Sequence, residues 1–128
     1  MDRKEWPVVA AVSAGGVLGA LARYGISAAW PHHPGGFAWS TWAVNVSGSF
    51  LIGVLMVLIA TRRPAQRFLR PFFGVGVLGG YTTFSTAMVD VQQAAPGTAL
   101  LYLGATIVVA LVAVRAGSAL TSAVSRSR

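Results

Sequence analysis

Four long apolar stretches alternate with short polar segments along the chain, approximately over residues 7–30, 38–60, 71–91 and 98–124. Each stretch is close to the roughly 20 residues that a helix needs to cross a bilayer. The connections contain proline, glycine and charged residues and leave no room for a second domain. The pattern therefore predicts an all-α integral membrane protein, with four transmembrane helices in a single domain over residues 1–128.

The composition agrees with this prediction. Of the 128 residues, 55% are hydrophobic and only 10% are charged, whereas a soluble domain carries roughly 25% charged residues. A soluble core of this size could not cover so much apolar surface, but in a bilayer that surface can face lipid. The chain contains no cysteine, which excludes disulfides and metal sites built from thiolates.

The basic residues gather in three polar segments. Eight of the ten lie there: Arg3, Lys4, Arg62, Arg63, Arg67, Arg70, Arg126 and Arg128. Clusters between apolar stretches are typical of topology signals and of attraction to anionic headgroups, so the net charge of +7 does not indicate nucleic-acid binding. With four spans the three segments share one side, and only Arg23 lies on the other. We therefore predict a multi-pass protein of the cell (inner or plasma) membrane with both termini in the cytoplasm.

Small residues recur on one face of the first span, at Gly15, Gly16, Gly19 and Ala20. Such a face lets helix backbones approach closely in lipid. Arg23 follows one turn after Gly19 on the same face, where a guanidinium needs water, a carbonyl group or an anion. A side chain that reaches out to the headgroups is the alternative; the position on the packed face favours a water-filled vestibule.

Polar residues form a stripe on the second span. Thr41, Asn45 and Ser49 are spaced by four and so lie on one helix face. An asparagine amide within the membrane needs hydrogen-bond partners, because an unpaired polar group there is unfavourable by several kcal/mol. Two interpretations stay open, a hydrogen bond between helices and the lining of a pathway.

The third span has an unusual composition over residues 74–86. Three glycines within five residues, Gly76, Gly79 and Gly80, precede the β-branched pair Thr82 and Thr83. Both features disfavour a continuous helix and predict a break near Gly79 to Thr83. Non-helical backbone within a membrane is tolerated where it is buried in protein or lines a cavity, and the carbonyl groups it releases can bind a hard cation. A kinked packing helix is the alternative.

The remaining polar groups are suited to binding an anion. Tyr102 and Thr106 place two hydroxyls one turn apart on the fourth span. No carboxylate lies deep in a span, since Asp90 is near the end of the third, and His32 and His33 lie in a loop. The chain therefore lacks the residues of acid/base or metal-dependent catalysis and is predicted not to be an enzyme. Neutral N–H and O–H donors can replace the lost hydration of an anion.

Three segments, GVLGALARY (16–24), TWAVNVSGSF (41–50) and GVLGGYTTFST (76–86), resemble the CrcB/Fluc family of fluoride channels in order and spacing. The resemblance implies a fluoride-specific channel that lowers cytoplasmic fluoride by passive export and so reduces its toxicity. It also implies an antiparallel dimer of four-helix subunits, with two narrow fluoride pathways and one central structural sodium ion that is not transported.

The resemblance also assigns roles to individual residues. Asn45 matches the pore asparagine, Phe84 the first phenylalanine of an aromatic box, and Arg23 the vestibule arginine. Tyr102 and Thr106 match a polar track on the last helix, with Thr where Ser is usual. The full predicted fluoride pathway comprises Asn45, Phe84, Tyr102, Thr106, Ser85, Thr41 and Arg23. The implied sodium ligands are the backbone carbonyl groups of Gly79 and Thr82.

Two features depart from the family pattern. Members usually read Thr-Thr-Phe-Ser-Thr-Phe, and here Ala87 replaces the second phenylalanine, which leaves the aromatic box incomplete. The strong charge bias also predicts a single orientation in the membrane. We therefore favour pairing with a paralogous subunit of opposite topology over pairing with a second copy.

Two other functions fit the sequence less well. A small proton-coupled multidrug transporter has the same size and four spans, but it needs a glutamate within the first span, and Glu5 precedes it. A structural helper of another membrane complex would leave Asn45 and the predicted break without a use.

Overall fold

The structure is a computed structural model that describes residues 1–61 and 67–128. Within these residues, four helical spans are long and apolar enough to cross a membrane: Trp6–Ala29, Trp39–Thr61, Arg70–Gln93 and Pro96–Arg126. The all-α prediction with four spans is confirmed, and the helix ends fall within two residues of the predicted ones. Arg62 and Arg63, counted above with the basic residues of one side, lie outside the described residues.

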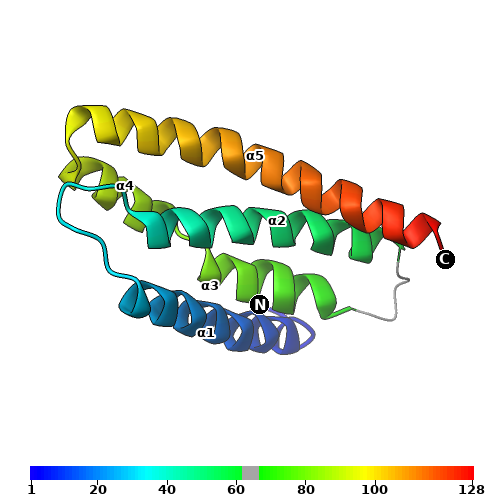
Figure 1. Ribbon diagram of the computed structural model, residues 1–128. Helices are drawn as coiled ribbons and strands as arrows, with labels where there is room; N and C mark the ends of the chain where they lie inside the picture. The colour runs from blue at the N-terminus through cyan, green and yellow to red at the C-terminus, as the bar shows by residue number, and fades with distance from the viewer. Residues whose placement is uncertain (62–66) are drawn as a thin grey trace.

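The spans pack as two pairs. Helix α1 (Trp6–Ala29) packs mainly on the first half of the third span, and α2 (Trp39–Thr61) packs mainly on α5 (Pro96–Arg126). Figure 1 shows α5 lying along α2, with α1 and α3 next to each other below them. Each pair joins alternate spans, the first with the third and the second with the fourth, so the two helices of a pair run in the same direction.

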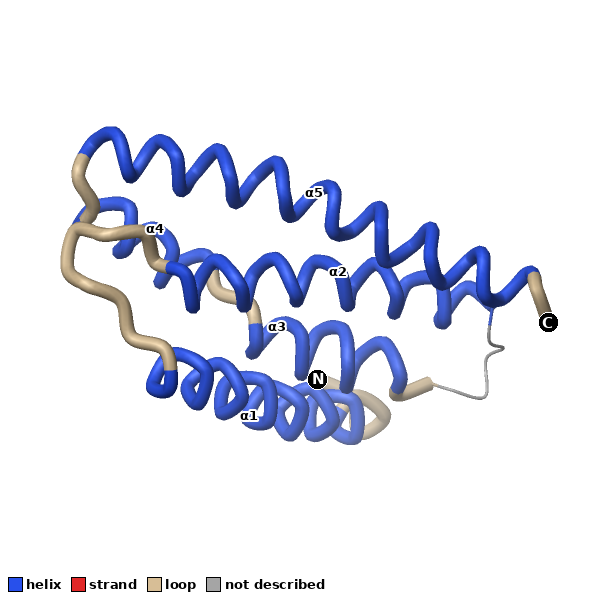
Figure 2. The backbone as a smooth tube through the Cα atoms, viewed as in Figure 1, coloured by secondary structure: helices blue, strands red, loops and turns tan. Residues whose placement is uncertain are grey.

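The third span is divided into three helical pieces. It begins as a π-helix, η1 (Arg70–Leu78), continues as α3 (Gly79–Tyr81) and resumes as α4 (Phe84–Gln93). Between α3 and α4, Thr82 and Thr83 are extended, with ψ angles of 153° and 119°. Figure 2 shows this interruption as loop backbone between α3 and α4.

Glycines bring α1 close to η1 and α3. A Cβ atom on Gly19 would collide with the carbonyl oxygen of Val77, and one on Gly80 would collide with the carbonyl oxygen of Gly16. Small residues allow this close approach of helix backbones in lipid. The packing interpretation of the small residues in the first span therefore agrees with the structure.

The position of the predicted break is right, but its expected cause is partly wrong. Gly79 has helical angles, φ −64° and ψ −38°, and the helix continues through Gly80 to Tyr81. The extended residues are the two threonines, whose β-branched side chains disfavour helix. Gly76 and Gly80 serve close packing on α1, and the chain leaves the helix only after them.

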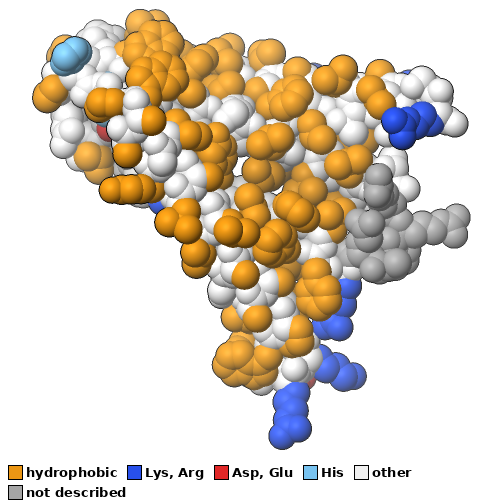
Figure 3. Space-filling view, turned by 60° about the horizontal axis from the view of Figure 1, so that its bottom comes forward, with side chains coloured by type: hydrophobic (Ala, Val, Ile, Leu, Met, Phe, Trp, Pro, Cys, Tyr) orange, Lys and Arg blue, Asp and Glu red, His pale blue; other side chains and the backbone are white. Residues whose placement is uncertain are grey.

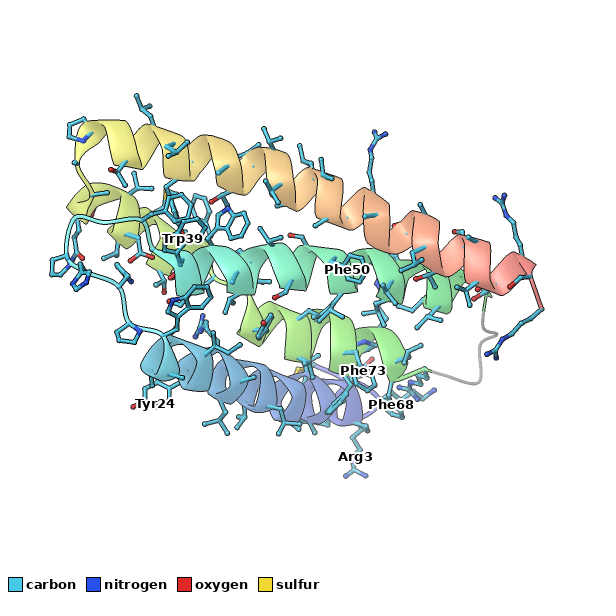
Figure 4. The ribbon with its side chains drawn as sticks, viewed as in Figure 1. Arg3, Tyr24, Trp39, Phe50, Phe68 and Phe73 are labelled. Carbon is cyan, nitrogen blue, oxygen red and sulfur yellow. The ribbon has the colours of Figure 1, made fainter. Side chains whose placement is uncertain are left out.

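The two ends of the bundle differ in charge. Most of the Lys and Arg side chains visible in Figure 3 lie toward one end, and the visible histidine lies at the other. Figure 4 places Arg3 and Trp39 toward opposite ends of the bundle, and Tyr24 points away from it. Large apolar side chains are exposed on the outer faces of α1 and α5, among them Leu18, Leu101 and Leu111. This surface suits lipid or a second subunit better than water.

Candidate functional site

The break in the third span is held by hydrogen bonds of its own threonines. Thr83 caps α4: its Oγ1 accepts from the backbone N–H of Thr86 at 3.2 Å and donates to Thr86 Oγ1 at 3.1 Å. Thr82 Oγ1 donates back to the carbonyl oxygen of Leu78 at 2.9 Å. The cap starts a new helix immediately after the two extended residues.

Asn45 on α2 binds this break from the neighbouring helix. Its Oδ1 accepts from the backbone N–H of Thr83 at 2.8 Å, and its Nδ2 donates to the backbone carbonyl oxygen of Thr83 at 3.0 Å. The side chain therefore makes the interhelical hydrogen bonds of the first interpretation. It also lines a pocket, so the structure does not force a choice between the two interpretations.

A pocket of about 450 Å³ opens between α2, the third span and α5. Six of the predicted site residues line it: Asn45, Gly79, Thr82, Phe84, Tyr102 and Thr106. Apolar side chains such as Ile52, Leu78 and Ile107 make up much of the remaining wall. A few polar groups in an apolar wall are typical of a site that replaces the hydration of a small solute.

Two hydroxyls in this pocket have no partner in the described part of the protein. Tyr102 is only 2% exposed, and neither its hydroxyl nor that of Thr106 makes a hydrogen bond there. Both groups lie on one face of α5. A buried hydroxyl without a partner is unfavourable by about 1–3 kcal/mol. Both hydroxyls are therefore available to bind a solute in the pocket.

Phe84 stands at the edge of the pocket, at the start of α4. Its side chain is 78% exposed although it is aromatic and lies in mid-span. The edge of a phenyl ring is electropositive and can face an anion. Its exposure also makes the ring available to a second subunit.

Three predicted pathway residues do not line this pocket. Thr41 is buried within α2, Ser85 is exposed in the first turn of α4, and Arg23 is half-buried on α1. Ser85 Oγ lies 3.4 Å from Thr83 Oγ1, so it adjoins the break. Within residues 1–61 and 67–128, the side chain of Arg23 makes no hydrogen bond or ion pair, and its backbone belongs to α1.

Ala87, the departure from the family motif, lies in the core of the subunit. It is 3% exposed and clusters with Ala38 and Tyr102. Partly buried side chains pack against this cluster: Phe37, Trp42, Met88 and Val91. These neighbours crowd the position on the subunit side, and the pocket borders it on the other. A larger ring at position 87 would therefore have to extend into the pocket.

Sequence reasoning missed two polar contacts. His32 Nε2 lies 3.7 Å from Asp90 Oδ1, and Asp90 is only 9% exposed, so the α1–α2 loop is tied to the end of α4. Ser47 Oγ lies 2.8 Å from the hydroxyl of Tyr81. Ser47 is two residues from Asn45 and off the predicted stripe, and no spacing in the sequence relates it to the third span. The His32–Asp90 contact joins residues that are still farther apart in the sequence.

Comparison with known proteins gives a consistent result. Residues 10–118 match the family model described as "CrcB-like protein, Camphor Resistance (CrcB)". A relative from Thermobifida fusca, named fluoride-specific ion channel FluC 2, is 53% identical over 121 residues, covering 91% of this chain and 90% of its own.

Streptomyces avermitilis has two similar proteins with numbered names. Its fluoride-specific ion channel FluC 2 is 54% identical over 105 residues, 79% of this chain and 66% of its own. Its FluC 3 is 50% identical over 86 residues, 67% of this chain and 42% of its own. One bacterium therefore contains more than one protein similar to this chain.

Proposed function

The chain belongs to the CrcB family, and from this premise we propose that it is a subunit of a fluoride-specific ion channel that exports cytoplasmic fluoride passively. This proposal rests mainly on the family match over residues 10–118, together with relatives named as fluoride-specific ion channels. The negative potential of the cytoplasm drives an anion outward, so the channel lowers cytoplasmic fluoride. The relatives favour this function over a proton-coupled multidrug transporter and over catalysis.

The pocket supports a pathway for a small, hard anion. Asn45, Tyr102 and Thr106 offer N–H and O–H donors to a solute that has lost its water. N–H and O–H donors in an apolar wall favour the smallest halide, because it can approach each donor most closely and so gains most from each hydrogen bond. We place Thr41, Ser85 and Arg23 on the same route, outside the pocket itself.

Vesicles that contain the assembled channel should release fluoride and retain chloride. The reason is that chloride is too large for close contact with all of the donors at once. Ion-selective electrodes for each halide measure the release, and vesicles without protein give the background. Comparable release of the two halides would contradict the assignment.

A sodium ion at the break fits the groups present there. In a continuous α-helix the carbonyl groups of Gly79 and Thr82 would accept from the N–H groups four residues later. Those N–H groups, of Thr83 and Thr86, donate to side-chain oxygens instead. The two carbonyl oxygens are therefore available to a hard cation, which favours oxygen ligands. We infer that they would hold a structural sodium ion, whose charge would stabilise the break.

Replacing sodium with N-methyl-D-glucamine should reduce fluoride efflux to a small fraction, because the large organic cation cannot bind between carbonyl groups. Thr82→Ser should retain efflux, since a backbone ligand does not depend on the methyl group. In Gly79→Leu, fluoride efflux should no longer depend on sodium, because a bulky side chain at this position distorts the arrangement of the carbonyl groups. A Cβ on Gly79 meets only Gly74 O, at 3.9 Å, so the subunit itself has room for a side chain. Efflux that is equal in sodium and in N-methyl-D-glucamine would argue against the site.

We further propose that the working unit is an antiparallel dimer with both termini of this chain in the cytoplasm. The pocket is bordered by the exposed ring of Phe84, which a second subunit can cover. The bias of basic residues to one end favours one orientation, and hence a paralogous partner inserted the other way. The occurrence of two similar proteins in one relative's organism is compatible with such pairing.

A further inference from the structure

We propose that Asn45 is a positioning residue for the cation site: by pairing with Thr83 it maintains the break that leaves the carbonyl groups of Gly79 and Thr82 available. This inference rests on the sodium site proposed above and adds to the role of Asn45 in the anion pathway. A single side chain of α2 would thus maintain the geometry of a site that is built from the backbone of the third span.

The two hydrogen bonds fix the orientation of the Asn45 amide. Oδ1 faces the N–H of Thr83 and Nδ2 faces its carbonyl oxygen, at 2.8 and 3.0 Å. The reversed amide would oppose donor to donor and acceptor to acceptor, so only this assignment satisfies both groups. The side chain thus pairs with Thr83 as a neighbouring β-strand would, and it stabilises the extended conformation that Thr83 adopts.

Without this pairing, the N–H of Thr83 can reach another acceptor if the ψ angle of Thr82 turns from 153° to a helical value. In a continuous helix its N–H would donate to the carbonyl oxygen of Gly79. Thr83 is buried, so water cannot easily satisfy the N–H group if Asn45 is removed. The backbone is then expected to close toward helix, and the carbonyl oxygen of Gly79 would no longer be available to a cation.

The side chain of Thr83 releases the second carbonyl group, that of Thr82, in a similar way. Its Oγ1 accepts from the N–H of Thr86, the group that would otherwise donate to the carbonyl oxygen of Thr82. Asn45 and the Thr83 hydroxyl therefore each occupy one helix donor, and the two carbonyl groups so released are those of Gly79 and Thr82. Removal of either side chain should affect cation binding although neither is a ligand.

The pathway role of Asn45 uses a different hydrogen atom. Nδ2 carries two hydrogens, and one of them is held by the carbonyl oxygen of Thr83. Asn45 also lines the pocket, where the second hydrogen is available to an anion. The two roles can therefore be separated by comparing Asn45 with a pocket residue that has no contact with the break.

The test measures sodium binding apart from fluoride transport. Full-length channel is purified with Asn45→Ala, with Thr106→Val and without change. The midpoint of thermal unfolding of each is then followed against sodium concentration, with N-methyl-D-glucamine as the replacing cation. Loss of an outer-shell partner of a metal ligand typically weakens metal affinity by roughly 10- to 100-fold. Asn45→Ala should raise the sodium concentration for half-maximal stabilisation by that factor. Thr106→Val should lose fluoride efflux. Its sodium concentration for half-maximal stabilisation should equal that of the unchanged protein.

A second pair of variants keeps the inference testable if Asn45→Ala does not fold. Thr83→Val removes the cap of α4 at nearly constant size and should also weaken sodium stabilisation. Thr83→Ser retains the hydroxyl and should restore it. Hydrogen exchange of the Thr83–Thr86 segment gives an independent measure, since its rate should change when the N–H of Thr83 or Thr86 exchanges a side-chain acceptor for a backbone carbonyl oxygen.

The outcomes distinguish the inference from the proposal beneath it. If sodium stabilises the unchanged protein and Asn45→Ala to the same degree and at the same concentration, Asn45 lines the pathway only and the inference is wrong. If sodium stabilises none of them, including the unchanged protein, the sodium site itself is wrong. Weakened sodium stabilisation in Asn45→Ala, with an unchanged sodium concentration for half-maximal stabilisation in Thr106→Val, supports the inference. Where Asn45→Ala does not fold, the same comparison is made with Thr83→Val.

Discussion

Expressed alone in a fluoride-sensitive bacterium, the chain is expected to insert in one orientation and to give almost no fluoride resistance. Its basic residues lie mainly in the segments on one side of the four spans, and Lys and Arg near the spans set orientation. Antiparallel pairing with a second copy would then be rare. Ala87 gives a second reason, since it leaves the subunit without one ring next to the pocket.

Co-expression with a paralogue of opposite charge bias should restore resistance to the level of a complete channel. The measurement combines a reporter at the carboxyl terminus, which reads its side of the membrane, with growth in fluoride. As a control, the same paralogue is expressed alone. Full resistance from this chain by itself, with its terminus on both sides in similar amounts, would show an ordinary dual-topology homodimer in which Ala87 is tolerated.

The second large effect is expected from Gly19→Ala in α1. The added Cβ would collide with the carbonyl oxygen of Val77, which is backbone and cannot move aside as a side chain can. Overpacking typically destabilises by about 1–3 kcal/mol, and here α1 would also have to separate from η1. We expect little folded protein in the membrane, measured by size-exclusion chromatography in detergent after mild heating.

Gly25→Ala in the same helix is the matched control. A Cβ there meets nothing within 4 Å, and alanine favours helix over glycine by up to about 1 kcal/mol. This variant should be as stable as the unchanged protein or slightly more so. Equal loss of folded protein in the two variants would show that α1 needs glycine for a reason other than its close contact with η1.

The number and length of the helices follow from the sequence because they depend on apolar runs matched to a bilayer. The position of the break also follows, since Thr82 and Thr83 disfavour helix. Its cause follows only in part: Gly80 packs on α1, and the extended backbone is held by Asn45 as well. A hydrogen bond across 38 residues leaves no periodic trace in a chain.

The pocket residues could be proposed from spacing and family resemblance only in part. Asn45, Tyr102 and Thr106 lie on the expected faces and meet in one pocket. Thr41 shares the face of Asn45 by spacing but is buried before the pocket begins, because α2 packs there against its neighbours. The contact of His32 with Asp90 depends on how a loop folds back, and hydrophobic periodicity contains no information about loops.

The basic end of the subunit has a consequence for the current that the channel carries. A partner inserted the other way, and oriented by the same positive-inside rule, would place its own Lys and Arg on the cytoplasmic side. Both pathways would then have a positive potential at the cytoplasmic mouth, which raises the local concentration of anions within about a Debye length, roughly 8 Å at physiological salt. Outward fluoride flux would exceed inward flux at equal and opposite driving force, and the difference would shrink as salt is added. A dual-topology homodimer would have two equivalent faces and would not rectify.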